Sequence, residues 1–182
     1  TWNVRTMKQA GKMMEVAREM NKYAIDIMAV QEIRWQGEGR IDKKEFSMIY
    51  SGTSENTGQF GTGFLLSKTA RKTLLEYENV NHRICRIRLK GKFRNITIIS
   101  VHAPTEEKEE TEKESFYDVL EKVCTKTSQH DTLIVMGDFN AKVGKDEEQK
   151  QVAGIHTLHE KNNDNGNMMV HFAAGNKLFV KS

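Results

Sequence analysis

The pattern of hydrophobic and polar positions predicts a chain that mixes short strands with amphipathic helices. Apolar side chains recur at helical spacing over residues 7–22, and residues 106–126 form a second helical stretch with an acidic first turn. A shorter helix is predicted over residues 168–174. Apolar runs bounded by turn-forming residues predict strands at residues 2–4, 25–30, 46–50, 64–67, 83–89, 95–101, 132–137 and 178–180.

Two of these strands are predicted to form a hairpin. The strand at residues 83–89 alternates apolar and polar side chains, with Arg86 and Arg88 on its polar face, and a short turn joins it to the strand at residues 95–101. Loops are expected at residues 33–42 and 51–63. This mixture of elements, with hairpins among the strands, indicates the α/β to α+β class with layered sheets.

The composition indicates one globular domain. Of the 182 residues, 37% are hydrophobic and 29% are charged. No apolar run approaches the roughly 20 residues of a membrane span, so no membrane partner is expected. Without a secretory signal, and with Cys85 and Cys124 far apart in apolar stretches, we expect buried free thiols in an intracellular protein, with the nucleus as one candidate location. A disulfide is the less favoured alternative. The sequence does not indicate an oligomeric state.

The net charge of +3 conceals an uneven distribution. Residues 1–100 carry 18 Lys and Arg against 10 Asp and Glu, whereas residues 101–182 carry 10 against 15. The first part is therefore net +8 and the second net −5. A basic first half suits a polyanion such as nucleic acid, although ordinary surface variation also produces differences of this size.

Polar side chains lie at or directly after the ends of four of the predicted strands. They are Asn3, Glu32, His102, and the pair Asp138 and Asn140. A single such carboxylate is most often a loop residue or a helix cap, but four strand ends of this kind predict a functional site, because loops at strand ends present many active-site side chains. Side chains two apart on an extended segment face the same way, so Asp138 and Asn140 are expected to point into one space.

The residue types restrict the chemistry of such a site. Two carboxylates with amides suit a hard cation bound through oxygen, so Mg²⁺ is the expected ion, with Mn²⁺ as an alternative. Zinc is not indicated, because His156 and His159 have no thiolate or carboxylate partners in a zinc-binding pattern. The sequence also has no Walker-type phosphate loop and no serine nucleophile elbow. Metal-assisted attack of water on a phosphate ester is the remaining chemistry.

Four motifs resemble, in order and spacing, the endonuclease/exonuclease/phosphatase superfamily, and within it the LINE-type retrotransposon endonuclease branch. They are Trp2-Asn3-Val4, Gln31-Glu32, Val101-His102-Ala103-Pro104-Thr105 and Met136-Gly137-Asp138-Phe139-Asn140. The resemblance extends over essentially all of residues 1–182. It implies an α/β (α+β) fold, a four-layer sandwich of two facing mixed β-sheets flanked by helices.

The resemblance also implies a role for each strand-end residue, with DNA as the substrate. Glu32 would be the principal Mg²⁺ ligand, and Asp138 would position or deprotonate the attacking water. Asn140 and Asn3 would hold phosphate oxygens or the nucleophile. His102 stands where many DNA-cleaving relatives have tyrosine, and either side chain can donate a hydrogen bond to a phosphate oxygen.

The chain departs from the superfamily pattern at several positions. The family's C-terminal segment supplies a Ser-Asp-His motif that completes the metal and phosphate site, and this motif does not occur in the 182 residues. Because the chain also begins inside an element without an initiator Met, we expect a partial domain that lacks the final strands. Arg5 replaces a second acidic residue of some relatives, and Thr105 replaces an asparagine. His171 is not expected to replace the missing histidine.

Three functions follow from these observations. The first is a Mg²⁺-dependent DNA endonuclease domain that nicks phosphodiester bonds and is weak or inactive as this fragment. The second is a phosphatase acting on a small phosphorylated substrate such as an inositol phosphate, which is disfavoured because the longer signatures of such enzymes are absent. The third is a catalytically dead remnant that binds a partner.

Overall fold

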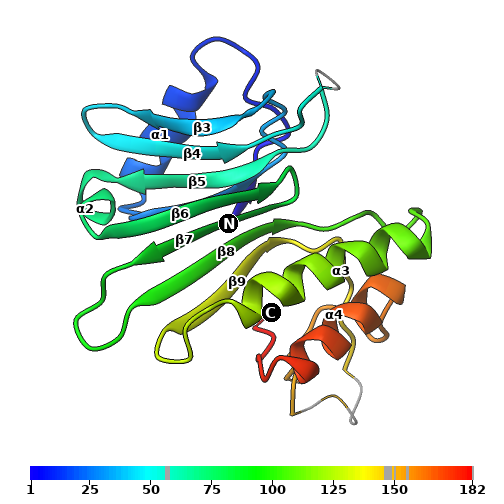
Figure 1. Ribbon diagram of the computed structural model, residues 1–182. Helices are drawn as coiled ribbons and strands as arrows, with labels where there is room; N and C mark the ends of the chain where they lie inside the picture. The colour runs from blue at the N-terminus through cyan, green and yellow to red at the C-terminus, as the bar shows by residue number, and fades with distance from the viewer. Residues whose placement is uncertain (56–57, 146–148, 150, 155, 182) are drawn as a thin grey trace. The chain divides into compact units, whose positions relative to one another are not determined.

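The chain divides into two compact units in the computed structural model, which describes residues 1–55, 58–145, 149, 151–154 and 156–181. The first unit contains Thr1–His102 and Thr127–Asp138, and it holds every strand of two β-sheets (Figure 1). The second unit contains Ala103–Lys126 and Phe139–Ser182, with two long helices.

The first sheet has five strands in the order β1-β2-β5-β4-β3. β1 runs parallel to β2, and the other neighbouring strands are antiparallel, so the sheet is mixed. The strands are β1 (Trp2–Asn3), β2 (Ile27–Gln31), β3 (Glu38–Asp42), β4 (Phe46–Ser51) and β5 (Thr62–Ser67).

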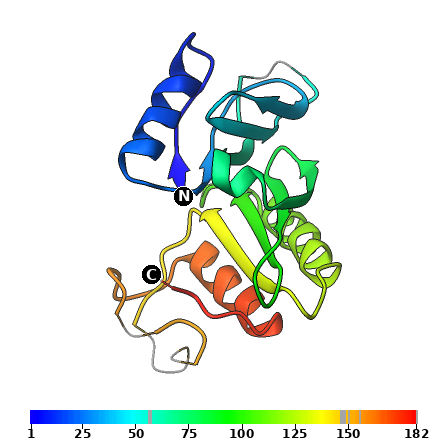
Figure 2. The same ribbon diagram turned by 90° about the vertical axis from the view of Figure 1, so that its left-hand side faces the viewer.

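The second sheet has four strands in the order β6-β7-β8-β9. β6, β7 and β8 are antiparallel neighbours, whereas β8 and β9 run parallel and lie side by side in Figure 2 (green and yellow). The strands are β6 (Leu74–Asn81), β7 (Ile84–Leu89), β8 (Ile96–His102) and β9 (Thr132–Asp138).

Strand alternation gives the first sheet a separate apolar core on each face. On β2, Met28 and Val30 pack in one cluster with helix α1 (Lys12–Lys22), which buries Val16, Ala17 and Met20. Ala29, which lies between them in the sequence, belongs to the other cluster, together with side chains of the second sheet and of the short helix α2 (Lys68–Arg71). Because successive side chains of a strand point to opposite faces, one apolar run supplies both cores.

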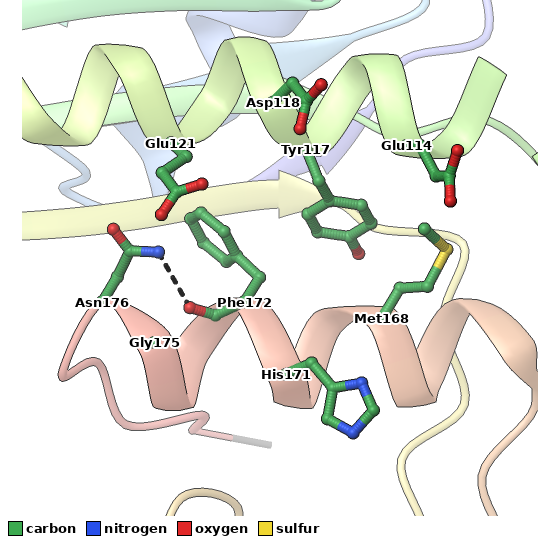
Figure 3. Close-up of a pocket in the computed structure, with 9 residues that line it drawn as sticks. All are labelled: Glu114, Tyr117, Asp118, Glu121, Met168, His171, Phe172, Gly175 and Asn176. Carbon is green, nitrogen blue, oxygen red and sulfur yellow. Dashed lines mark hydrogen bonds between the residues drawn. The ribbon is translucent and has the colours of Figure 1, made fainter. Parts of the chain in front are cut away.

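The second unit packs helix α3 (Glu110–Thr125) on helix α4 (Asp164–Gly175). The rings of Tyr117 and Phe172 point toward one another from the two helices, with their centroids 5.5 Å apart (Figure 3). Both residues line a pocket of about 460 Å³, whose lining also includes carboxylates of α3. None of the strand-end residues predicted to form a site is among the described residues that line this pocket.

Two strands are present where the sequence pattern did not predict them. The expected loop at residues 33–42 contains β3, and the unassigned segment before residue 83 contains β6. Both strands lie at the edges of their sheets, and most of their side chains are exposed or half-buried. An edge strand of this kind lacks the apolar run by which the buried strands were found.

Several predicted boundaries were also wrong. The first helix begins at Lys12 rather than at residue 7, because Met7 is buried and its backbone N–H donates to the carbonyl of Ile33. The second helix begins at Glu110 rather than at residue 106. The predicted strand at residues 178–180 is not a strand, and its Val180 N–H instead donates to the Val152 carbonyl. The last helix is longer than predicted.

The predicted class, the predicted hairpin and the predicted free thiols are confirmed. The class is α/β with two mixed sheets, and β7 and β8 form the predicted antiparallel hairpin. Cys85 and Cys124 are buried free thiols. β9 is half-buried rather than buried, because it is the edge strand of its sheet. No helix among the described residues is both long enough and apolar enough to span a membrane.

Candidate active site

One side-chain amide connects the ends of strands from both sheets of the first unit. The Nδ2 atom of Asn3 donates hydrogen bonds to Oε1 of Glu32 at 2.7 Å and to Oδ2 of Asp138 at 2.9 Å. Two carboxylates that are far apart in the sequence therefore converge on one nitrogen atom. The Oδ1 atom of the same amide accepts a hydrogen bond from the backbone N–H of Arg5 at 3.0 Å, which fixes the amide's orientation.

The pairing of the strands explains this convergence. β1 is parallel to β2 with Asn3 opposite Gln31, so the two strands end together and Glu32 follows directly. In the second sheet, β8 is parallel to β9 with His102 opposite Asp138. Carboxyl ends of parallel strands meet at one edge of a sheet, and each sheet contributes one such pair of ends.

Gly137 permits the close strand pairing that places Asp138. Its φ angle is +154°, and a Cβ atom at this position would lie 2.0 Å from the carbonyl oxygen of Val101 on β8. Any larger residue would therefore force β9 away from β8 immediately before the carboxylate. Position 137 therefore requires a glycine so that the next residue, Asp138, can lie at the end of β9 beside β8.

Glu32 is held by two donors and by a strained backbone. Its φ angle of +56° lies in the left-handed region, which costs a non-glycine residue about 1–3 kcal/mol. Besides the bond from Asn3, its Oε2 atom accepts a hydrogen bond from the Arg34 guanidinium at 2.7 Å. Desolvation raises the pKa of Glu32, but these hydrogen bonds, the charge of Arg34 and, in the acid range where Glu32 titrates, the charge of protonated His102 outweigh it. The pKa is therefore below its ordinary value, and the carboxylate is charged at neutral pH.

His102 is the most buried of the strand-end side chains, with 7% of its surface exposed. Its Nδ1 atom has no hydrogen-bond partner within the described part of the chain. Burial lowers the pKa of His102, as does the nearby charge of Arg83, whereas Asp138 and Glu32 act in the opposite direction; the net pKa is lowered, so the ring is neutral at pH 7. An unpartnered buried nitrogen costs about 1–3 kcal/mol, which a ligand or water at Nδ1 would recover.

Asn140 belongs to the second unit. β9 ends at Asp138, and Asn140 has a left-handed φ angle of +49°, so the alternation argument that paired the two side chains does not apply to it. Its Nδ2 atom donates to the carbonyl of Ala103 at 2.9 Å. Asn3, Glu32, His102 and Asp138 are thus the predicted site residues that lie together in the first unit.

A buried polar network that the sequence analysis missed connects the two sheets. The Nε2 atom of Gln31 on β2 donates to Oγ of Ser100 on β8 at 3.2 Å, and the hydroxyls of Ser100 and Thr62 are 2.7 Å apart. The Thr62 hydroxyl also donates to the Val30 carbonyl. All three polar side chains are at most 1% exposed. The only signal in the sequence is a polar residue inside an apolar run, as in Ile98-Ile99-Ser100-Val101.

The predicted basic face of β7 is neutralised by acidic partners. Arg86 forms ion pairs with Glu76 at 3.0 Å and Glu78 at 3.1 Å, and Arg88 bonds Asp131 through two nitrogen atoms at 2.6 and 3.0 Å. These guanidinium groups are not available for phosphate in this arrangement. This face of β7 therefore lends no support to the binding of a polyanion.

The histidines of the second unit are all exposed. His171 is exposed on α4 (Figure 3), and His156 and His159 are exposed in the preceding segment. Among the described residues, no group of three or more His, Cys, Asp and Glu side chains could hold a metal ion. The carboxylate pair of Glu32 and Asp138 does not suit zinc, but it fits a hard cation that keeps several waters and takes further oxygens from a phosphate.

Residues 1–149 match the Endonuclease/Exonuclease/phosphatase family. The chain belongs to this family. The chain is also similar to craniofacial development protein 2 of Bos taurus, with which it is 33% identical over 180 residues. The matched region covers 99% of this chain and 30% of that protein. The chain therefore spans less than a third of the relative's length.

Solved structures share the family fold. The endonuclease domain of TRAS1, a telomere-specific non-LTR retrotransposon, superposes with a TM-score of 0.61 at 16% identity, over 96% of this chain and 70% of that one. The AP endonuclease LMAP from Leishmania major gives a TM-score of 0.64 at 15% identity, over 96% and 65% of the two chains. The predicted superfamily is confirmed by the family match, and the predicted fold by these structures.

Proposed function

We propose that this chain is a DNA endonuclease domain that nicks phosphodiester bonds with Mg²⁺, for which Mn²⁺ can substitute. The observation that carries the proposal is the convergence of Glu32 and Asp138 on the amide of Asn3. Two negative charges held together attract a cation, and carboxylate oxygens are ligands that Mg²⁺ prefers. When bound there, the ion would neutralise phosphate charge and lower the pKa of a coordinated water.

The protein's own groups have distinct roles in this proposal. Glu32 would be the principal ligand, since its lowered pKa keeps it charged. Asp138 would orient or deprotonate the attacking water. Asn3 would hold the two carboxylates in place. Asn140 would contact a phosphate oxygen or the nucleophile. His102, neutral and with Nδ1 unpartnered within the described residues, would form a hydrogen bond with a phosphate oxygen.

The choice of DNA rests on relatives and on charge. The two solved structures named above are an AP endonuclease and a retrotransposon endonuclease domain, and both share this fold. Residues 1–100 also carry a net charge of +8, which favours a polyanionic substrate even after the ion pairs of β7 are discounted. The proposal includes an origin in a LINE-type retrotransposon. It also includes a nuclear location, because the enzyme needs access to chromosomal DNA.

Nicking of supercoiled plasmid tests the proposal. The purified 182-residue chain is incubated with plasmid in Mg²⁺, in Mn²⁺ and in EDTA, and the open-circular product is measured. We expect slow nicking with either metal, none in EDTA, and none with Asp138→Ala. The matched control is Asp118→Asn, which removes an exposed carboxylate from α3 and should nick at the wild-type rate.

The rate of the 182-residue chain should lie below that of a longer version that includes a Ser-Asp-His motif, because that motif is absent from the sequence. If neither version nicks plasmid but either releases phosphate from an inositol phosphate, the phosphatase alternative replaces this proposal. If neither activity is found in either version, the chain is a binding remnant. Nicking that persists in Asp138→Ala would show that the strand-end carboxylates are not the site.

A further inference from the structure

Asn165 uses both hydrogens of its side-chain amide to hold two loops of the second unit together. Its Nδ2 atom donates to the carbonyl of Asn140 at 3.0 Å and to the carbonyl of Pro104 at 3.0 Å. The first loop follows β9, and the second follows β8. The side chain is only 2% exposed, so water cannot easily replace either bond.

The backbone around Asn165 is itself anchored to one of these loops. The carboxylate of Glu106 accepts hydrogen bonds from the side chain of Asn163 at 2.6 Å, from the N–H of Asp164 at 3.0 Å and from the N–H of Asn165 at 3.3 Å. Glu106 was expected to complement the dipole of the helix that follows it in the sequence, but it instead bonds the first turn of α4. A carboxylate at this helix N-terminus satisfies donors that the helix leaves unpaired.

The other loop is fixed to the same turn. Asn163 caps α4 by accepting a hydrogen bond from the Gly166 N–H at 2.8 Å, and the same oxygen accepts one from the Lys142 N–H at 2.8 Å. A Cβ atom on Gly166 would lie 2.0 Å from the Lys142 carbonyl oxygen, so only glycine allows this approach. The sequence Asn163-Asp164-Asn165-Gly166 thus connects the start of α4 to both loops.

We propose that Asn165 is a positioning residue that sets the backbone of Asn140 for the reaction. The left-handed φ angle of Asn140 is a conformation that an unrestrained asparagine leaves readily, and the bonds from Asn165 and to Ala103 hold its backbone and its side chain. The role in catalysis rests on the proposed function of Asn140. The restraint on the loops does not, and it is tested separately.

Asn165→Asp is the sharpest test of the restraint, because it keeps the side-chain shape and turns the donor into an acceptor that faces two carbonyl oxygens. Hydrogen exchange followed by mass spectrometry should be at least several-fold faster in peptides covering residues 103–108 and 139–145 than in the wild-type protein. The matched control is Asn176→Asp at the other end of α4, which loses one bond to the Phe172 carbonyl and should leave both peptides unchanged. Unchanged exchange of both peptides in Asn165→Asp would overturn the proposal.

A double-mutant cycle tests the catalytic part. Asn165→Asp should lower kcat for nicking by about 10- to 100-fold with little change in KM, because a misplaced group loses rate steeply. If Asn165 acts through Asn140, Asn140→Ala combined with Asn165→Asp should be no slower than Asn140→Ala alone. If the double variant instead shows the product of the two single-variant rate losses, Asn165 has only a structural role. If the wild-type chain does not nick, the proposed function fails, and the exchange experiment still decides whether Asn165 positions Asn140.

Discussion

Replacing Asn3 by Asp tests whether Glu32 and Asp138 truly meet at one amide. The substitution keeps the shape of the side chain but puts a carboxylate where the shared donor stood. Two hydrogen bonds to charged acceptors are lost, worth about 1.5–3 kcal/mol each when buried. The values are smaller here because the Glu32 side chain is 24% exposed. Repulsion between unit charges 4 Å apart adds about 1–4 kcal/mol per pair, depending on the local dielectric constant.

Protonation of the introduced carboxyl group limits this loss. A neutral carboxyl group has one O–H, which can replace one of the lost hydrogen bonds. With an unfolded-state pKa of about 3.9, taking up that proton costs about 4 kcal/mol at pH 7 and about 1.5 kcal/mol at pH 5. Adding the one hydrogen bond that is still lost, we expect the free energy of unfolding to fall by about 4–5 kcal/mol at pH 7 and by about 2–3 kcal/mol at pH 5. The sign follows from linkage: the introduced group has a raised pKa in the folded state, so its destabilisation is complete at neutral pH and fades toward pH 4.

Urea unfolding in EDTA at both pH values measures this effect, with Asn3→Ala as the matched control. The alanine variant loses the same donor without adding a charge, so the difference between the variants isolates the repulsion. We expect Asn3→Asp to be less stable than Asn3→Ala at pH 7, with the difference largely closed at pH 5. Equal stabilities at pH 7, with equal dependence on urea concentration, would refute the convergence of the carboxylates. Added Mg²⁺ should stabilise Asn3→Asp more than Asn3→Ala, because the third carboxylate is a further ligand.

Three further predictions concern the surroundings of the site. Arg34→Gln should raise the pKa of Glu32, which carbon NMR of its carboxyl group measures. The stability that Glu32 contributes is lost as pH falls through its folded-state pKa, so the variant should lose this stability at a higher pH than the wild-type protein. An unchanged pKa would contradict the ion pair. Thr62→Val and Ser100→Ala should each lower the free energy of unfolding by about 1–3 kcal/mol, and the double variant should lose less than the sum of the two, whereas strict additivity would show that the hydroxyls do not interact. Gly137→Ala should lower it by at least about 2 kcal/mol because of the clash with β8; a wild-type urea midpoint would exclude that clash.

The sequence predicted the elements that have either one apolar face or a continuous apolar run. β2, β8 and β9 were found from their apolar runs, and α1 from its helical spacing of apolar side chains. β3 and β6 were not found, because, unlike the edge strand β9, they have no continuous apolar run, and they are held by backbone pairing with β4 and β7. Their pairing partners are a property of the whole sheet, which no local window of the sequence reports.

The same distinction applies to the strand-end site. The sequence alone identified Asn3, Glu32, His102 and Asp138 as polar residues that end apolar strands, and their motifs placed the chain in its family. It could not show that Asn3 and Asp138, 135 positions apart, would be joined by a hydrogen bond. That contact depends on how the strands are ordered and packed in the two sheets.

The tertiary structure alone decided which polar groups are neutralised, buried or shared. Arg86 and Arg88 have a basic pattern in the sequence, but strand pairing and packing bring acidic partners to them. Ser100 and Asn165 look ordinary in the sequence, yet burial turns their hydrogen bonds into fixed connections. The physical reason is that hydrophobic periodicity records which side of an element is buried, whereas polar interactions depend on short distances that only the assembled fold sets.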